Sequence, residues 1–584
     1  MAQNEHEPPE SETPEQLADP SQPESTPADA PQATGHKSVA RSAGIVSIAV
    51  MFSRVLGLVR ETIFARFFGA GFLYDAFVVA FKIPNILRDL FAEGALSAAF
   101  VKVFTDYQIK KNEAEAWRLA GLIFNVLAVV LSVITVIGIL IAPYIIPLLA
   151  RGFSPEKAAL AVTLTQIMFP FILLVALAAL AMGVLNTKGR FGIPASASTA
   201  FNIASIIFGL GFAYILSGGG WESSFAKDVI PSEAAQWAII GMAIGTLIGG
   251  AAQLLIQLPS LLKVGFRFLP VLSFTDPGVK RIMRLMGPAI IGTSAVQVKV
   301  LVDVLVVSGI EGGQSWLSFA FRLMQFPIGV FGVAVGTAAI PALSRLASEN
   351  NIAKFRDTLS GALKLVFLLT IPSACGLIVL AAPIIALIYQ GGRFKSFDTD
   401  MTAWALSAYS IGLAGYAAIK VLSPSFYALD DAKTPMYVSI ASIAVHAPMS
   451  FGMMYMLSTV GVTPERPNGF GHVGVALATS TVALVNFLAL TFLMRRRINR
   501  LNGGDIFSSL IKIVLASTVM SIVAYGSYYF LTNYLGDKTF IVRLIEAFVP
   551  IGLAGITFVI AAKLLRIGEL QKIFEAVSRK LGRE

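Results

Sequence analysis

The sequence is poor in the residues on which soluble enzymes and secreted scaffolds depend. Only 14% of its 584 residues are charged, whereas ordinary soluble domains carry about 25%. Its one cysteine, Cys375, excludes an intrachain disulfide and is expected to be a packing residue. We predict no metal site, because the four histidines form no cluster with metal-ligand spacing. They are His6, His36, His446 and His472.

Motifs for nucleotide-driven or covalent chemistry are also missing. The sequence has no P-loop, no Gly-x-Ser-x-Gly and no His-Glu-x-x-His stretch. A membrane glycosyltransferase or ligase would need a sizeable loop with candidate bases. The longest connection on the side poor in Lys and Arg, near 218–234, holds only Glu222, Asp228 and Glu233. We therefore predict no catalytic residues, no cofactor and no enzyme activity.

Long apolar runs dominate what remains. The composition is 55% hydrophobic with a mean hydropathy of +0.73, and runs of about 20 residues, enough to cross a bilayer, recur along the chain. About fourteen such runs predict an all-α polytopic membrane protein. The net charge of +10 is explained by basic cytoplasmic loops, so no nucleic-acid partner is predicted.

Lys and Arg alternate between rich and poor connections, which predicts the orientation. The rich connections include 102–111, 263–284 and 495–500, and by the positive-inside rule they are cytoplasmic. Both termini are then cytoplasmic. Residues 1–40 are rich in Pro, Glu and Ser and predict a disordered cytoplasmic tail, and residues 567–584 predict a basic cytoplasmic tail.

An internal repeat at an offset of about 240 residues predicts two lobes of parallel orientation. Ala142-Pro143 corresponds to Ala382-Pro383, Lys82 corresponds to Arg322, and Pro194 corresponds to Pro435. Six spans per unit give an N-lobe at 41–265 and a C-lobe at 280–500. Two additional C-terminal helices at 506–566 lie outside the repeat.

The first two spans, between Met51 and Val101, carry many charges. Each would cost roughly 2.5–3.5 kcal/mol at bilayer depth, so such residues usually face a cavity. Arginine forks suit phosphate or pyrophosphate, which predicts a phosphate-bearing substrate. The alternative is that some of these charges only form internal ion pairs or reach the membrane surface. The predicted substrate-binding residues are Arg54, Arg60, Glu61, Asp75, Lys82, Arg88, Glu93 and Arg322.

The C-lobe adds a second candidate group. Lys299 and Asp303 are one helical turn apart and can pair. An internal ion pair and an ion-coupling role are both open for them. His446 has no acidic neighbour on its own predicted helix, and we expect it to be a core or cavity-lining residue.

Four stretches resemble the MurJ/MviN lipid II flippases, in the MOP superfamily that also includes MATE drug exporters. They are SRVLGLVRETIFARFFGAG, DAFVVAFKIPNILRDLFAEGALSAAFV, FAFRLMQFPIGVFGVAVGTAAIPALS and FYALDDAKTP. The resemblance implies fourteen spans, two lobes around a central cavity, and a groove for a lipid tail at 506–566. It implies that Arg54, Arg60 and Arg322 bind the headgroup, with Asp75, Arg88 and Glu93 as further functional charges.

The resemblance also implies an activity: movement of lipid II from the inner to the outer leaflet of a bacterial inner membrane by alternating access, for cell-wall biogenesis and cell shape. The expected partners are lipid II and membrane lipids, and the chain is expected to be a monomer. A flippase for another polyprenyl-linked glycan, a MATE-like drug exporter and a non-transporting scaffold remain alternatives.

Coupling to sodium, protons or membrane potential stays open. A sodium site in part of the family uses an acidic residue that matches Asp303, but its other acidic and amide ligands are replaced here by residues such as His446 and Ser450.

Overall fold

The computed structural model describes residues 33–90, 96–219, 232–536 and 539–571, together with residues 575 and 578. The predicted disordered tail therefore lies outside the described residues, except for 33–40, which begin the first helix. Glu93 and most of the predicted basic tail also lie outside them.

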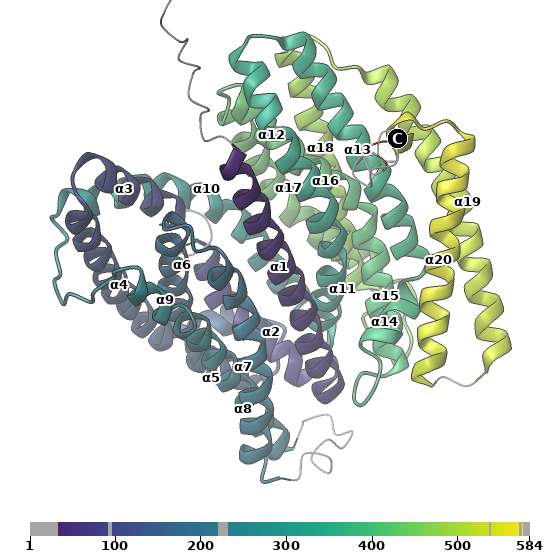
Figure 1. The fold of residues 1–584 in the computed structure, drawn as a ribbon. Helices are drawn as coiled ribbons and strands as arrows, with labels where there is room; N and C mark the ends of the chain where they lie inside the picture. The colour runs from purple at the N-terminus through teal and green to yellow at the C-terminus, as the bar shows by residue number, and fades with distance from the viewer. Residues whose placement is uncertain are drawn as a thin grey trace, which may run out of the picture.

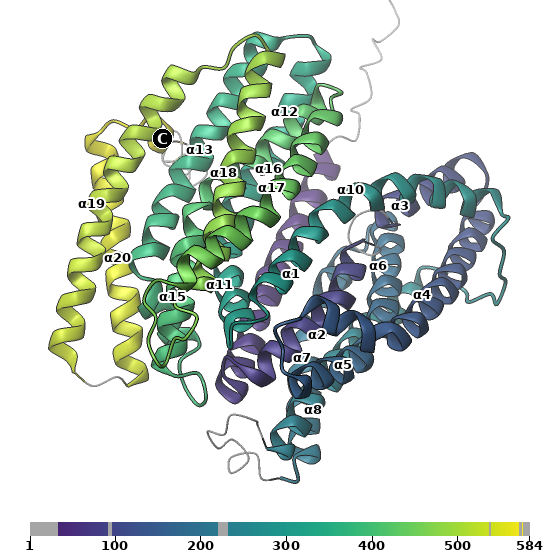
Figure 2. The same ribbon diagram turned by 180° about the vertical axis from the view of Figure 1, so that it is seen from behind.

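The described chain is almost entirely helical, as predicted, and Figures 1 and 2 show it as two bundles joined side by side. The first bundle contains α1 (Ala33–Phe68), α2 (Phe72–Arg88), α3 (Leu96–Lys110), α4 (Glu113–Leu149), α5 (Pro155–Met168), α6 (Phe171–Thr187), α7 (Gly192–Leu216), α8 (Glu233–Leu255) and α9 (Leu258–Lys263). Helix α10 (Pro277–Val307) runs diagonally from the first bundle to the second.

The second bundle contains α11 (Gly313–Pro327), the π-helix η3 (Ile328–Gly332), α12 (Val333–Ser348), α13 (Ile352–Val379), α14 (Ala381–Ile388), α15 (Ser396–Ile411), α16 (Leu413–Ala428), α17 (Lys433–Ser458) and α18 (Gly471–Arg497). A last pair, α19 (Gly503–Leu535) and α20 (Phe540–Leu564), packs on the outer edge of this bundle against α13 and α14 (Figure 1).

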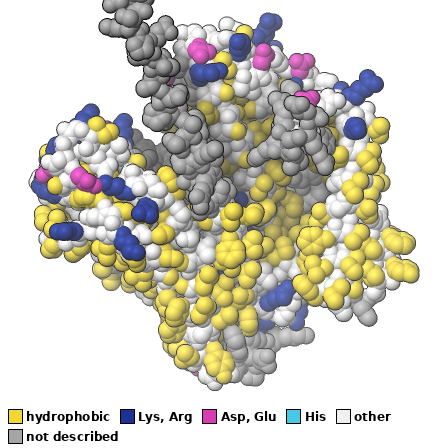
Figure 3. Space-filling view, viewed as in Figure 1, with side chains coloured by type: hydrophobic (Ala, Val, Ile, Leu, Met, Phe, Trp, Pro, Cys, Tyr) yellow, Lys and Arg dark blue, Asp and Glu magenta, His cyan; other side chains and the backbone are white. Residues whose placement is uncertain are grey.

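Length and composition identify most helices as membrane spans. Within the described residues, ten helices are long and apolar enough, or eleven if the bent pair α15–α16 is one span. The other expected spans coincide with α1, α2–α3 and α10, which carry the charged residues. Fourteen spans therefore remain a prediction that agrees with the structure. Figure 3 shows hydrophobic side chains along the flanks, Lys and Arg toward the upper ends of the bundles, and a further basic group low on the second bundle.

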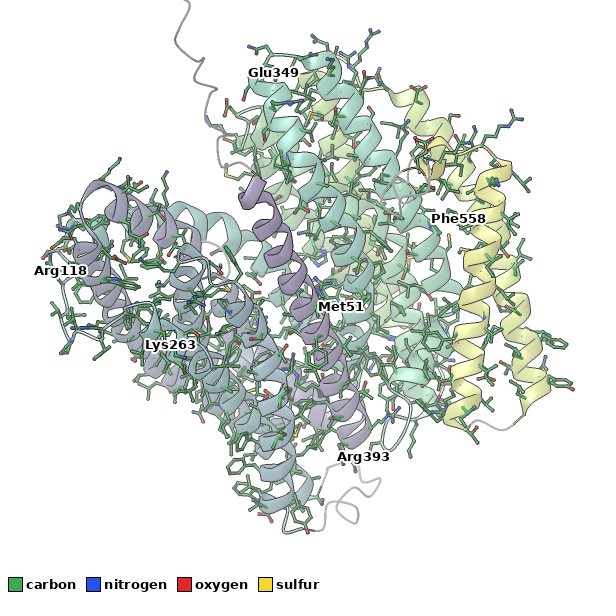
Figure 4. The ribbon with its side chains drawn as sticks, viewed as in Figure 1. Met51, Arg118, Lys263, Glu349, Arg393 and Phe558 are labelled. Atoms are coloured by element: carbon green, nitrogen blue, oxygen red, sulfur yellow. The ribbon has the colours of Figure 1, made fainter. Side chains whose placement is uncertain are left out.

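We call the end with the Lys- and Arg-rich loops the basic end and the other the opposite end. The start of α1 and the last described residues both lie at the basic end (Figure 1). In Figure 4, Glu349 marks the basic end and Arg393 the opposite end.

Small residues make the α7–α8 seam unusually close. A Cβ on Gly245 would lie 2.2 Å from the Cα of Gly209, and one on Gly241 would lie 2.3 Å from the amide nitrogen of Ala213. Such small-residue seams let helix backbones approach in membranes, where van der Waals packing rather than hydrophobic exclusion drives association. Helices α7 and α8 are therefore held as one tightly packed pair.

The hydrophobic core is divided at the basic end and shared at the opposite end. One cluster lies inside the first bundle and includes Phe104 and Leu185. Another lies inside the second and includes Phe355. The largest cluster crosses between the bundles at the opposite end, where Tyr74 of α2 stacks on Phe319 of α11 with ring centroids 4.8 Å apart. The two bundles are thus sealed together at the opposite end.

Candidate functional site

Asp75 forms the polar centre of the seal. Its carboxylate is fully buried and accepts hydrogen bonds from the backbone N–H groups of Gly312 and Ser315, each at 2.9 Å. It also accepts from the Ser315 hydroxyl at 2.6 Å and from the Lys157 ammonium at 2.8 Å. These N–H groups belong to the start of α11, where a carboxylate is favoured. Asp75 therefore caps a helix of the second bundle from a helix of the first.

A salt bridge and a loop contact extend this seal. Lys157, only 3% exposed, also bonds the Glu311 carboxylate at 2.8 Å. Beside them, the N–H of Arg393 donates to the backbone carbonyl of Arg66 at 2.9 Å. A Cβ on Gly392 would lie 2.2 Å from that same oxygen, and its φ of +55° also favours glycine. In this conformation Asp75 is already saturated by protein donors.

The central charges lie farther from the seal, on the faces where the bundles meet. Arg322 of α11 forms an ion pair with Glu61 of α1, with 2.5 Å between Nη2 and Oε1. The Arg322 side chain is 54% exposed, whereas Glu61 is 8% exposed. Arg322 reaches a helix of the other bundle and still meets solvent. The space between the bundles is therefore open at this point. The second Glu61 oxygen, Oε2, is buried without a hydrogen-bond partner.

Arg60 is held by an aromatic ring and left with an unused donor. Its guanidinium lies over Phe201 of α7, 4.8 Å from the ring centroid. Its Nη1 is buried without a hydrogen-bond partner, although buried polar groups are almost always paired. Glu61, Arg322 and Arg88 all lie within electrostatic range of Arg60. Three arginines against one carboxylate, which is itself paired with Arg322, leave a positive excess, and with the unpaired Arg60 donor they suit an anionic oxygen ligand.

Arg54 points across to the second bundle. A Cβ on Gly329 would lie 2.3 Å from Arg54 Nη1, so the guanidinium packs directly on the π-helix η3 that follows Pro327. Met51, one turn earlier on α1, is 62% exposed and lies midway along the molecule between the bundles (Figure 4). Arg54, itself exposed, thus reaches the same space as Arg322.

Lys82 and Arg88 complete the predicted set on α2. Lys82 lies within electrostatic range of Asp303 and Arg322. Arg88 Nη2 lies 2.6 Å from the carboxylate of its neighbour Asp89, and Asp89 also accepts from Gln297 of α10 at 3.4 Å. The structure therefore brings Arg54, Arg60, Glu61, Lys82 and Arg322 to the facing sides of the bundles. Asp75 lies in the seal, and Glu93 is outside the described residues.

The possible Lys299–Asp303 ion pair does not form. The Lys299 ammonium donates to the Tyr416 hydroxyl of α16 at 2.8 Å. Asp303 instead pairs with His446 of α17, with 2.7 Å between Oδ1 and Nε2. The pairing was missed because His446 has no acidic neighbour on its own helix, and its partner comes from a helix more than a hundred residues away. Local spacing carries no signal for such a contact.

These residues do not fit the sodium site that the resemblance implies. Hard cations take several oxygen ligands, but the Asp303 carboxylate is engaged by an imidazole nitrogen. Ser450 Oγ lies 3.2 Å from that same nitrogen. Across the described ranges, no group of three or more His, Cys, Asp or Glu residues is arranged to hold a metal ion.

Other residues of the site were also missed by sequence reasoning. Phe201, Gly329 and Ser315 were not predicted, because an apolar ring, a glycine and a serine in apolar runs read as packing residues. For Gly329 the sequence does offer one signal, the nearby Pro327. A proline removes a backbone hydrogen bond from its helix, so it predicts a local irregularity at this point.

Known proteins resemble this chain over most of its length. A family model described as lipid II flippase MurJ matches residues 64–545. A probable lipid II flippase MurJ of Buchnera aphidicola subsp. Acyrthosiphon pisum is 34% identical over 526 residues, covering 89% of this chain and 96% of that protein. The lipid II flippase MurJ of Burkholderia cenocepacia is 36% identical over 459 residues, covering 77% and 83%.

Solved structures agree. One described as lipid II flippase MurJ in an inward closed conformation matches with a TM-score of 0.69 and 29% identity, covering 89% of this chain and 99% of that one. An inward-facing MATE family transporter of the MOP superfamily matches with a TM-score of 0.61 at 16% identity, which is a likeness of fold. This chain is a multi-pass membrane protein, and it belongs to the lipid II flippase MurJ family.

Proposed function

We propose that this protein moves lipid II, the undecaprenyl-pyrophosphate-linked peptidoglycan precursor, from the inner to the outer leaflet of the bacterial inner membrane. The observation that carries the proposal is the unpaired Arg60 Nη1 beside Arg322, buried at the facing sides of the two bundles. Guanidinium groups bind pyrophosphate oxygens in bidentate geometry. A cationic drug would meet several arginines in this space, which disfavours a drug exporter.

Alternating access explains how the headgroup crosses. The bundles share a core at the opposite end and have separate cores at the basic end, so the headgroup enters from the basic end, which we assign to the cytoplasm with both termini. Opening the other side requires the α11 N-terminus to leave Asp75. The lipid tail stays in the membrane, and α19–α20 are the candidate tail groove. The protein acts as a monomer and performs no covalent chemistry.

The direct experiment is lipid II flipping by the purified full chain in lipid vesicles. Photocrosslinking residues placed at Met51 and at Gln325, next to the central arginines, should yield lipid II adducts. Replacing both Arg54 and Arg322 by alanine should abolish flipping, while replacing Arg118, on the exposed surface of the first bundle (Figure 4), should not. Flipping that survives loss of both central arginines contradicts the mechanism.

A further inference from the structure

The charged side chains on the facing sides of the bundles carry more positive than negative charge. Arg322 is 54% exposed even though it is paired with Glu61, and Arg60 Nη1 is buried without a hydrogen-bond partner. The positive groups are Arg54, Arg60, Lys82, Arg88 and Arg322, and the acids beside them are Glu61, Asp89 and Asp303. This space therefore suits a flexible anionic chain as well as an anionic headgroup.

An acidic stretch of the sequence comes directly before the helix that lines this space. Residues 1–32 lie outside the described residues, and their sequence contains eight acids and no Lys or Arg. We call this stretch the acidic tail. The acids are Glu5, Glu7, Glu10, Glu12, Glu15, Asp19, Glu24 and Asp29. The charge of the acidic tail is therefore complementary to that of the central arginines.

The acidic tail is attached where the space between the bundles opens. It joins α1 at Ala33, and the start of α1 lies at the basic end between the two bundles (Figures 1 and 2). The bundles have separate cores at this end. From there α1 runs past the exposed side chain of Met51 to Arg54. The same helix thus carries the acidic tail at one end and two of the central arginines farther along.

The acidic tail is long enough to fold back to these arginines. Arg54 follows Ala33 by 21 residues, which is about 32 Å along a helix that rises 1.5 Å per residue. An extended chain covers about 3.3–3.6 Å per residue, so about ten residues span the same distance. Six of the eight acids, from Glu5 to Asp19, precede Ala33 by more than ten residues. Their carboxylates can therefore reach Arg54 while the acidic tail stays attached to α1.

The basic side chains on the outer surface of the basic end are weaker partners for the acidic tail. Some already have acids of their own: Arg345 lies 3.6 Å from Glu349, and Arg281 lies 2.7 Å from Asp106. Exposed ion pairs are also screened by solvent and contribute little. On the cytoplasmic side, to which we assign the basic end, the anionic membrane surface attracts Lys and Arg and repels an acidic chain. Charge and attachment together favour the space between the bundles.

We propose that the acidic tail is an internal competitor of the anionic headgroup: its carboxylates occupy the central arginines of the empty protein, and the headgroup displaces them. The contact rests on charge, reach and attachment, and the competition with a headgroup rests on the proposed function. Attachment to α1 gives the acidic tail an effective concentration of about millimolar, so weak individual contacts suffice. The acidic tail lowers the affinity for the headgroup and makes that affinity depend on salt.

The first test measures binding of inorganic pyrophosphate to the purified full chain at low salt. Deleting residues 1–32 should tighten binding by about threefold to tenfold, because the attached competitor is gone. The matched control keeps the length of the acidic tail and replaces its eight acids by Gln and Asn, and it should bind as tightly as the deletion variant. Both gains should vanish near 1 M salt, where the Debye length is about 3 Å. Native affinity in both variants overturns the proposal.

The second test locates the acidic tail by photocrosslinking in the full chain without ligand. A crosslinking residue at Ala18, beside Asp19, should form adducts with peptides that contain Arg54 or Arg322, and added pyrophosphate should reduce their yield. Ala30 is the matched control, because three residues of extended chain span only about 11 Å and do not reach Arg54. Adducts from Ala18 that fall only on surface loops of the basic end would contradict the proposal.

The third test measures lipid II flipping in vesicles and separates this inference from the proposed function. Deleting residues 1–32 should lower the KM for lipid II by about threefold or more and leave kcat unchanged, as expected when a competitor of the free protein is removed. A lower kcat at unchanged KM would contradict the proposal. If the native chain flips no lipid II, the proposed function is wrong, but the pyrophosphate and crosslinking tests still decide whether the acidic tail occupies the arginines. Thermal melting confirms that each variant folds.

Discussion

The charged side chains that the two bundles turn toward each other differ in how they are paired. On the first bundle, Arg60 Nη1 and Glu61 Oε2 are buried without partners. On the second, Asp303 is paired with His446, Lys299 with Tyr416, and Arg322 with Glu61 across the gap. A buried donor without a partner costs free energy unless a ligand satisfies it, so under the proposed function Arg60 Nη1 is the group placed to meet the headgroup.

The largest expected effect comes from Asp75→Asn, which breaks the contact that holds the bundles together. Removing one partner of a buried ion pair costs about 3 kcal/mol, and here the α11 N-terminus also loses its capping charge. Hydrogen exchange of the segment 311–317 should accelerate strongly. Asp276→Asn is the control, because Asp276 caps its own helix α10 and should leave that segment unchanged. Equal exchange in both variants would show that Asp75 is not the seal.

Arg60→Ala directly tests headgroup binding by the first bundle. The variant loses hydrogen bonds to an anionic ligand, each worth about 1.5–3 kcal/mol, so flipping should fall roughly 10- to 100-fold. Arg60→Lys keeps the charge but loses the planar fork over Phe201, and it should recover only part of the rate. Native flipping in Arg60→Ala would remove the distinction between the two bundles.

Gly329→Ala tests whether the second bundle positions the Arg54 guanidinium of the first. The new Cβ would meet the Arg54 guanidinium, which is flexible and would move aside, so flipping should fall by about threefold to tenfold with little change in melting temperature. Gly361→Ala is the matched control, since a Cβ there has no atom within 4 Å. Equal rates in the two variants would show that the position of Arg54 is unimportant.

Lys299→Gln should have a small effect on flipping, about twofold, because Lys299 already donates to the Tyr416 hydroxyl and is not among the proposed headgroup residues. The measurement is the same vesicle assay. A loss as large as that of Arg60→Ala would mean that the second bundle also binds substrate.

The smallest expected effect is on the stability of the second bundle, through the carboxylate of Asp431. Two hydrogen bonds from Thr434 lower the pKa of this carboxyl. Its stabilisation is complete above the unfolded pKa of about 3.9 and is lost as the pH falls through the lower folded value. Thr434→Val should reduce stability by about 0.5 kcal/mol at pH 7, since solvent screens the site. Melting curves should converge at strongly acidic pH, and a larger difference there would contradict this account.

The sequence predicted the helical architecture and the location of most central charges, because apolar length and intramembrane charge are properties of single helices. Lys82 and Arg322 were matched by the repeat, and both face the same space. It did not predict which charges pair. Asp303 with His446 and Asp75 with Ser315 depend on the packing of distant helices, which spacing within one helix does not encode. The contact between Gly329 and the Arg54 guanidinium depends on the π-helix η3, which follows from tertiary contacts.

Helix α10 has a mechanical consequence, because its two halves belong to different bundles. Val279, Ile282 and Met286 pack in the core of the first bundle, whereas Asp303 is tied to α17 of the second. Gly287 lies between the part of α10 that packs against the first bundle and the part that contacts the second. A Cβ at Gly287 would meet nothing within 4 Å. No close packing requires a glycine at this point, although glycine inside a helix costs about 1 kcal/mol relative to alanine. We therefore expect α10 to bend or twist near Gly287 when one bundle rotates against the other. The same rotation would strain the Asp303–His446 contact.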